Sequence, residues 1–352
     1  MVAKTTHLAL VAPKLGALNF TGAAMPWKPP IDKILALCLL HNQSEQPLET
    51  LDYWKQNECP PEQFADWRDL KIYPIDIGDR KYHKAGVGSA SEFIVKEFGL
   101  KLTDGFQSLV SMINENNKTG NLKGRKFAVA HMLREMYELE DSQELHLEII
   151  RKTMDVLEAH ARVVNGELNQ PEEGLSDALP DLVEQFAGCN NAALTLGRYL
   201  RDLWLLGEEP AEIRSRIDFW LNGWGEVQAR LAKGVEAFNK LSPLDWSAAG
   251  TKGIALHTDD RFLAKAAIKS GRYGIRIIVS GTGHTVISTN GFDLSKLHAA
   301  LEKLEPGRWY YQAKMGALIN GGPQYVGVEP TGVGSQQLIG LLKMHVQPKA
   351  KK

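Results

Sequence analysis

The chain has 352 residues, of which 43% are hydrophobic and 24% charged, and its formal net charge is −1. This composition is ordinary for a globular protein, and a net charge near zero gives no general field for the capture of nucleic acid. Three cysteines without a C-x-x-C pair argue against a zinc site and against a disulfide framework. The sequence has no signal-peptide pattern and no apolar run near the ~18 residues of a membrane span, so we expect a cytoplasmic protein that does not bind membranes.

The first part of the chain, about residues 1–120, mixes strands with helices. We expect strands at 7–12 and 71–77, and helices at 31–41, 47–56 and 88–98. The last of these helices starts with a capping box, Ser89-x-x-Glu92, in which each side chain satisfies a backbone donor near the other. Strand–helix alternation of this kind predicts a parallel sheet covered by helices.

The middle of the chain, about residues 121–245, is almost entirely helical. Apolar residues recur at spacings of three and four in segments 127–139, 144–164, 179–187, 191–206 and 211–241. The aromatic residues of this region are expected to form a helical core, with nucleotide stacking as the minor alternative.

The third part, about residues 246–346, returns to α/β alternation. We expect strands at 253–257, 275–280, 284–289, 309–312 and 317–320, and helices at 259–270, 294–304 and 335–344. Gly281-Thr-Gly283 lies between two of these strands and predicts a β-hairpin. Residues 347–352 form a basic tail. The predicted fold class is α/β: a parallel-sheet domain, a helical insertion, and a second, smaller α/β domain.

Residues 75–86 are the most informative stretch of the sequence. They read as a buried strand that ends in an acidic turn and is followed by the start of a helix. Asp76, at the carboxyl end of this strand, lies where α/β proteins place their chemistry. A metal-dependent phosphoesterase would have several carboxylates and histidines here, whereas this chain has one histidine, a lysine and an alanine. The segment therefore indicates a hydrolase scaffold without most of its catalytic groups.

The sequence lacks two other hydrolase motifs. It contains no G-x-x-x-x-G-K-[ST] loop, which excludes a P-loop nucleotidase. It also contains no G-x-S-x-G elbow of the kind that carries a serine nucleophile.

The order of elements resembles the DHH phosphoesterase superfamily, and in particular its MYG1-like branch. The resemblance covers most of the chain and is carried by segments 32–40, 75–78, 89–100, 157–160 and 309–322, followed by Pro330-Thr331. Members of this superfamily bind two divalent metal ions, usually manganese, between a sheet domain and a smaller C-terminal domain. They hydrolyse phosphodiesters, pyrophosphate or short oligonucleotides, with the metal pair clamping the attacking and leaving oxygens.

The family's first two metal-binding motifs are only partly kept in this chain. The first, His-x-Asp-x-Asp, corresponds to Lys28-Pro-Pro-Ile-Asp32, in which only the last aspartate remains. The second is an aspartate at a strand end, and Asp76 matches it. The resemblance implies that Asp32 and Asp76 are the metal ligands if a metal is kept. Alternatively, Asp32 is an acidic residue favoured by a helix N-terminus, and Asp76 stabilises a turn.

The third and fourth motifs are further from the family pattern. The third, Asp-His-His, becomes His83-Lys84-Ala85, so a lysine ammonium stands where a cation should bind, and like charges at contact oppose each other. The fourth, an aspartate, falls among Asn114, Asn116 and Asn117. The resemblance implies His83 as the third catalytic residue beside the two aspartates, although it can equally be an exposed loop residue.

The resemblance also implies a substrate-binding segment near the C-terminus. In the family, glycines at the position of Gly321 and Gly322 let the backbone approach a phosphate, because glycine has no Cβ. Lys314 and Asn320 flank these glycines and could bind an anion, as could Lys84 in the third motif. The alternative for the glycines is a turn that only needs a positive φ.

Two weaker groups of residues complete the candidates. The segment 114–126 reads as a polar loop that could follow a phosphate backbone through a basic cluster, Lys118, Lys123, Arg125 and Lys126, or could simply be solvated. His257 lies at a strand end beside Asp259 and Asp260, where a helix cap explains the aspartates more simply than a metal site does.

Three functions remain open from the sequence. The first is a degenerate DHH-type phosphoesterase-like protein that binds a nucleotide, nucleic acid or protein partner without efficient catalysis and needs no cofactor. The second is an active phosphodiesterase or nuclease that depends on Mn²⁺ or Mg²⁺. The third is a structural subunit of a larger assembly or a homo-oligomer, with the helical middle as its interface.

Overall fold

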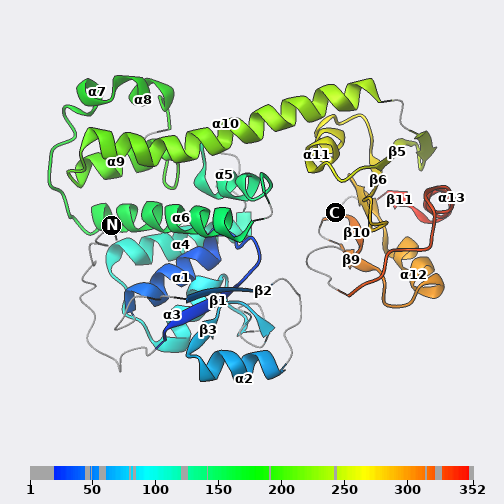
Figure 1. The fold of residues 1–352 in the computed structure, drawn as a ribbon, viewed down its shortest axis with the longest axis horizontal. Coiled ribbons are helices and arrows are strands. Elements are labelled where there is room, and N and C mark those ends of the chain that lie inside the picture. The colour runs from blue at the N-terminus through cyan, green and yellow to red at the C-terminus, as the bar shows by residue number, and fades with distance from the viewer. Residues whose placement is uncertain are drawn as a thin grey trace. The chain divides into compact units, whose positions relative to one another are not determined.

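The computed structural model describes residues 20–43, 48, 50–54, 61–78, 81, 85–119, 126–140, 142–189, 192–241, 244–313, 315–321 and 327–348. The chain forms two compact units, an N-terminal unit of residues 1–225 and a C-terminal unit of residues 226–352 (Figure 1). The strand predicted at 7–12 lies outside the described residues. Among the residues described, no helix combines the length and the apolar character that a bilayer crossing requires.

A parallel three-stranded sheet is the centre of the N-terminal unit. Its strands are β1 (Gly22–Pro26), β2 (Thr50–Trp54) and β3 (Ile72–Pro74), in the order β2-β1-β3. Ala24 in the central strand is level with Asp52 on one side and with Pro74 on the other. After β1 the chain therefore forms β2 on one side of it and then crosses over to form β3 on the other side.

Helices cover both faces of this sheet. Helix α1 (Ile31–Gln43) joins β1 to β2 and contacts α3 (Ala90–Phe98), α4 (Asp104–Thr119) and α6 (Gln143–Val164). A helix that is apolar on all sides is typical of a buried position, and six side chains of α1 are fully buried: Ile34, Leu35, Ala36, Cys38, Leu39 and Leu40. Helix α2 (Pro61–Asp69) joins β2 to β3 on the opposite face, where Trp67 packs on Ala24, Ile72 and Ile77 (Figure 1).

Two predictions for the N-terminal unit are wrong, and strand β1, helix α2 and the first part of α4 were not predicted. Residues 47–56 were predicted to be a helix, but Thr50–Trp54 is strand β2, because its β-branched and aromatic side chains suit a strand beside β1. Residues 114–126 were predicted to be a polar loop, but α4 continues to Thr119. The apolar residues that set the helical period lie before this polar end, and all are buried: Phe106, Leu109, Val110 and Ile113.

With one exception, the other helices that begin in this unit fall inside the predicted segments or start one residue before them. They are α5 (Val129–Met136), α6, α7 (Leu175–Ala178), α8 (Pro180–Gln185), α9 (Leu196–Leu205) and α10 (Pro210–Lys240). Helix α7 has no separate counterpart in the sequence pattern. Trp220 is fully buried, which agrees with the predicted helical core.

Helix α10 contains a matched pair of glycines near the boundary between the units. A Cβ on Gly223 would lie 2.3 Å from Cε of Met136, whereas a Cβ on Gly225 would meet nothing within 4 Å. Gly225→Ala is expected to raise the free energy of unfolding by about 1 kcal/mol, because alanine restricts the unfolded chain and favours the helix. Gly223→Ala should lose this gain, since the buried Met136 has to move. Urea denaturation of both variants checks the prediction, and equal effects would contradict it.

The C-terminal unit is built on a mixed six-stranded sheet. Its strands are β4 (Leu244–Ala248), β5 (Thr251–His257), β6 (Ile275–Val279), β7 (Thr285–Thr289), β9 (Tyr310–Gln312) and β10 (Ala317–Asn320). The order is β4-β5-β6-β7-β10-β9, with β5 and β6 parallel and the other pairs antiparallel. The predicted hairpin is confirmed by the pairing of β6 with β7, whereas β4 was not predicted.

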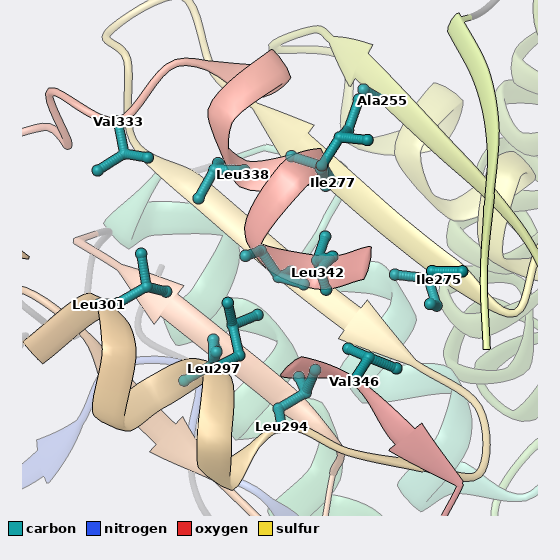
Figure 2. Close-up of a cluster of buried hydrophobic side chains, with 14 of the residues drawn as sticks. Ala255, Ile275, Ile277, Leu294, Leu297, Leu301, Val333, Leu338, Leu342 and Val346 are labelled. Carbon is teal, nitrogen blue, oxygen red and sulfur yellow. The ribbon is translucent and has the colours of Figure 1, made fainter. Parts of the chain in front are cut away.

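Helices α12 (Ser295–Leu304) and α13 (Ser335–His345) cover one face of this sheet. Figure 2 shows Leu297, Leu301, Leu338 and Leu342 pointing toward Ile277 of the sheet. On the other face, α11 (Arg261–Lys269) packs on β5 and β6 together with Phe238 from the end of α10. A short pair, β8 (Phe292–Asp293) with β11 (Gln347–Pro348), holds the start of the predicted basic tail. The predicted α/β fold class is confirmed.

Candidate functional site

Two candidate aspartates lie at the carboxyl edge of the parallel sheet. Strand β1 ends at Pro26 and Asp32 follows in the first turn of α1, while β3 ends at Pro74 and Asp76 follows in the next turn. With the order β2-β1-β3, the topological switch point of the sheet lies at the carboxyl ends of β1 and β3. Open α/β sheets bind their ligands at this point.

Asp32 is buried, with 4% of its surface exposed. Burial is the main reason why its pKa is raised; the charge of Lys33 opposes this shift, and the charge of Asp76 adds to it. The backbone N–H groups of Ala90 and Lys33 donate hydrogen bonds to its carboxylate. Because Ala90 is the first residue of α3, Asp32 ties the start of α1 to the N-terminus of α3.

Asp76 forms a short ion pair with Lys33. The distance from Lys33 Nζ to Asp76 Oδ2 is 2.7 Å, and the side chains are only 16% and 8% exposed. Asp76 has a φ of 53°, a left-handed conformation that residues other than glycine adopt uncommonly. Lys33 was not identified from the sequence, although it directly follows Asp32. The site therefore holds two carboxylates and one ammonium within a few residues of two strand ends.

The start of α3 forms the next part of the site. Ser89 Oγ accepts a hydrogen bond from the backbone N–H of Glu92 at 3.1 Å, as the predicted capping box requires. The reciprocal bond differs from the prediction, because Glu92 Oε2 accepts from the N–H of Gly88 at 2.7 Å. The Ser89 and Ser91 hydroxyl groups are buried and 2.9 Å apart.

The candidate asparagines of α4 face this helix start. Asn114 Nδ2 donates to Glu92 Oε2 at 3.1 Å, and Asn117 Nδ2 donates to the carbonyl of Gly88 at 3.1 Å. Asn116 is also buried. Asn114 Oδ1 is buried and accepts no hydrogen bond from any residue that the structure describes, so it is an acceptor that a bound ligand could satisfy.

Four predicted site residues lie outside the described residues: His83, Lys84, Lys314 and Gly322. Their catalytic or substrate-binding roles, like those of the other site residues, stay predictions.

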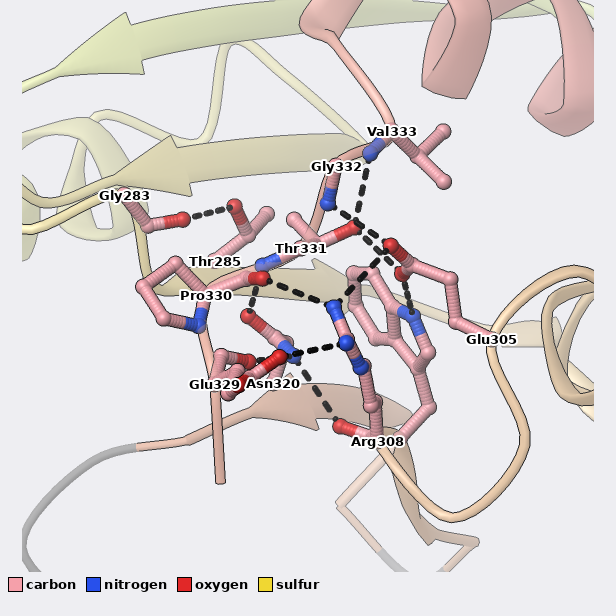
Figure 3. Close-up of polar contacts among 11 residues, drawn as sticks. Gly283, Thr285, Glu305, Arg308, Asn320, Glu329, Pro330, Thr331, Gly332 and Val333 are labelled. Atoms are coloured by element: carbon pink, nitrogen blue, oxygen red, sulfur yellow. Dashed lines mark hydrogen bonds and ion pairs between the residues drawn. The ribbon is translucent and has the colours of Figure 1, made fainter. Parts of the chain in front are cut away.

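Asn320, in the C-terminal unit, is completely buried. Its Nδ2 donates to the carbonyls of Arg308 at 3.1 Å and Glu329 at 3.2 Å, and its Oδ1 accepts from the N–H of Thr331 at 2.8 Å (Figure 3). Both amide hydrogens are used, so Asn320 ties β10 to two loops and has no donor left for an anion.

Gly321 has two steric reasons to be glycine. Its φ is 71°, and a Cβ at this position would lie 2.1 Å from Nδ1 of His284. The turn that needs a positive φ therefore accounts for this glycine without a ligand.

The weaker candidates of the C-terminal unit have structural partners. Asp260 caps α11 by accepting from the N–H groups of Phe262 and Leu263 at 2.8 and 3.2 Å. Asp259 Oδ1 accepts from the N–H of Gly281 in the hairpin at 2.8 Å. His257 Nε2 lies 3.1 Å from Ser335 Oγ. With Asp260 as its cap, α11 begins two residues after the predicted helix start at 259.

The described residues do not fit a centre of two divalent ions. Among them, no group of three or more histidine, cysteine, aspartate or glutamate side chains could hold a metal. Mg²⁺ takes six ligands, largely oxygens, and two such ions need several shared carboxylates. Here the carboxylate of Asp76 is already in contact with an ammonium.

Comparisons with known proteins give only distant structural similarity. No family model matches the chain, and no curated protein matches it. RecJ from Thermus thermophilus superposes in its Mn²⁺ complex with a TM-score of 0.40 and 9% identity, over 92% of this chain and 51% of RecJ. The Mg²⁺ complex of the same protein gives 0.38 and 8%, over 92% and 49%.

An uncharacterized protein from Helicobacter pylori G27 gives a TM-score of 0.28 and 10% identity, over 92% of this chain and 98% of that one. The chain thus spans about half the length of the RecJ structures. TM-scores this low establish no common fold, so no residue role is transferred from these proteins to this chain.

Proposed function

We propose that this protein is a DHH-type phosphoesterase-like protein that binds a nucleotide or oligonucleotide at the carboxyl edge of its parallel sheet, without efficient catalysis. The observation that supports this proposal is the placement of Asp32, Lys33 and Asp76 at the switch point between β1 and β3. The ligand class comes from the resemblance of the sequence to the DHH superfamily. The MYG1-like branch and a cytoplasmic location belong to the same proposal.

Lys33 gives this edge a way to bind a phosphate without a metal. A lysine ammonium has three donors, and Lys33 directs it to Asp76 at 2.7 Å while 16% of its side chain stays exposed. The same ammonium can therefore hold the carboxylate and a phosphate oxygen together. The buried acceptor Asn114 Oδ1 would favour a ligand group that donates a hydrogen bond.

Efficient turnover would need more than these groups supply. In a two-metal phosphoesterase, the ions activate the attacking water and neutralise the leaving oxygen. The described part of the site offers two carboxylates, one of them paired with Lys33. An active enzyme that uses His83 with Mn²⁺ or Mg²⁺, and a structural subunit that binds a protein or a second copy of itself, are the other outcomes of the test below.

The test measures binding and turnover separately. Differential scanning fluorimetry in excess EDTA, with the ribonucleoside 5′-monophosphates and a short 5′-phosphorylated oligonucleotide, should show a rise in Tm. The expected rise is roughly 5 °C when the ligand is about 100-fold above its Kd. With Mn²⁺ added, bis-p-nitrophenyl phosphate should not be hydrolysed above the uncatalysed rate.

Two variants assign the result to the site. Lys33→Met should abolish the shift caused by nucleotides, while Lys240→Met should preserve it, because Lys240 forms an ion pair with Glu236 in which both side chains are mostly exposed. Hydrolysis that requires Mn²⁺ and is lost in Asp76→Asn would establish the active enzyme instead. A fixed oligomer with no response to any of these ligands would overturn the proposal in favour of a structural subunit.

A further inference from the structure

The carboxyl edge of the parallel sheet contains its own cation. We propose that the ammonium of Lys33 permanently takes the place that a divalent metal ion would hold between the carboxylates of Asp32 and Asp76. This inference goes beyond the proposed function, because it concerns the charge of the site whether or not a phosphate binds there.

The positions of the three residues support this inference. Lys33 lies in the first turn of α1, directly after Asp32, and its side chain reaches Asp76 beyond the end of β3. It therefore connects the carboxyl ends of the two adjacent strands, β1 and β3. A metal ion bound by both aspartates would have to join the same two strand ends.

The electrostatics of the site favour a cation. Two carboxylates that are both largely buried repel each other strongly when no positive charge lies near them. Asp32 is 4% exposed, and the charge of Asp76 acts on it directly. The Lys33 ammonium lies 2.7 Å from one carboxylate and also stabilises the charge of the other. The ammonium thus offsets negative charge on the two carboxylates, as a bound metal ion would.

The hydrogen bonds of Asp32 point the same way. Its carboxylate accepts from the N–H of Ala90 at the N-terminus of α3 and from the N–H of Lys33. These two bonds use part of the acceptor capacity of the carboxylate, which has about four lone-pair sites. Each aspartate thus has a donor of its own, the start of α3 for Asp32 and the ammonium for Asp76.

The inference predicts that removal of the ammonium creates a requirement for a divalent ion. Lys33→Met keeps the length of the side chain and removes its charge. In EDTA its Tm should fall below that of the wild-type protein, and Mn²⁺ or Mg²⁺ should raise it by roughly 3 °C or more. The wild-type protein should show no such response to either ion.

A double variant separates charge repulsion from lost packing. In Lys33→Met/Asp76→Asn the second carboxylate is also neutral, so the Tm should recover in part and the response to Mn²⁺ should disappear. Lys240→Met is the matched control, because both side chains of its ion pair with Glu236 are mostly exposed, and it should behave like the wild-type protein.

Three results would overturn the inference. They are an equal Mn²⁺ response of the wild-type protein and Lys33→Met, an unchanged Tm of Lys33→Met in EDTA, and a Mn²⁺ response that persists in the double variant. If Lys33→Met does not fold in EDTA, the variant is purified once with Mn²⁺ and once without it. The yield of folded protein from the two purifications then replaces the comparison of Tm values. If the wild-type protein shows no rise in Tm with nucleotides but the Mn²⁺ results are as expected, the proposed function is wrong and this inference is still supported.

Discussion

Asp76→Asn is expected to lower the free energy of unfolding by about 3 kcal/mol at neutral pH. The substitution leaves the ammonium of Lys33, which is 16% exposed, without the carboxylate that lies 2.7 Å from it. Removing one partner of a largely buried ion pair costs about 3–5 kcal/mol, because the other charge stays desolvated. Urea denaturation at neutral pH measures the loss, which should change little with salt because the pair is shielded from solvent.

Asp32→Asn is the matched comparison for this prediction. The asparagine keeps an oxygen that can accept from the N–H of Ala90, and it removes the repulsion between Asp32 and Asp76. Its free energy of unfolding should therefore stay within about 1 kcal/mol of the wild-type value, or exceed it. If both variants lose the same free energy of unfolding, Lys33 does not interact more strongly with Asp76 than with Asp32. That result would contradict the ion pair described here.

Glu305→Gln is expected to lower the free energy of unfolding by about 2 kcal/mol at neutral pH, through the loop network of the C-terminal unit. Glu305 Oε2 accepts from Thr331 Oγ1 at 2.6 Å and from Trp309 Nε1 at 3.1 Å, and Oε1 accepts from the N–H of Gly332 at 2.7 Å (Figure 3). Hydrogen bonds to a charged group contribute about 1.5–3 kcal/mol each, and glutamine can replace only part of this set.

The same glutamate makes stability depend on pH. Burial would raise the pKa of Glu305, but the bonds from Thr331, Gly332 and Trp309 outweigh it and hold the pKa below its ordinary value of 4.5. An acid with a lowered folded pKa stabilises the fold above its unfolded pKa, and this stabilisation is lost as the pH falls through the folded pKa. The wild-type protein should thus lose more stability than Glu305→Gln when the pH falls below about 4.5.

Urea denaturation at neutral and acidic pH tests this pH dependence. Glu236→Gln is the control, since its ion pair with Lys240 leaves both side chains mostly exposed and should change stability by less than about 0.5 kcal/mol. Parallel pH profiles of the wild-type protein and Glu305→Gln would contradict the role assigned to this carboxylate.

Much of the fold could be predicted where local patterns are strong. The apolar run of α1 and the glycine turn between β6 and β7 specify their elements without help from distant residues. Strand β2 was missed because its five residues show no clear alternation and, among the strands described, it pairs with β1 alone. Helix α4 was missed because its polar end resembles a loop, although buried residues earlier in the helix have a helical spacing.

The candidate site could be predicted only in part, for a similar reason. Asp76 ends a strand pattern in the sequence, and strand ends are where parallel sheets place polar groups. Asp32 was identified only through the family resemblance, because strand β1, which precedes it, was not predicted. Lys33 has no such signal, because its importance comes from a contact with a residue far away in the sequence. Asn320 was placed in a substrate site because it precedes two glycines, but tertiary contacts with Arg308, Glu329 and Thr331 use its polar atoms.

Anomalous diffraction at the manganese edge, from crystals of the wild-type protein grown with excess Mn²⁺, tests the central claim most directly. The account predicts no manganese peak between Asp32 and Asp76, with the ammonium of Lys33 in contact with Asp76. Two manganese peaks about 3.5–4 Å apart at this edge of the sheet, as in dinuclear hydrolases, with Lys33 turned away, would contradict it.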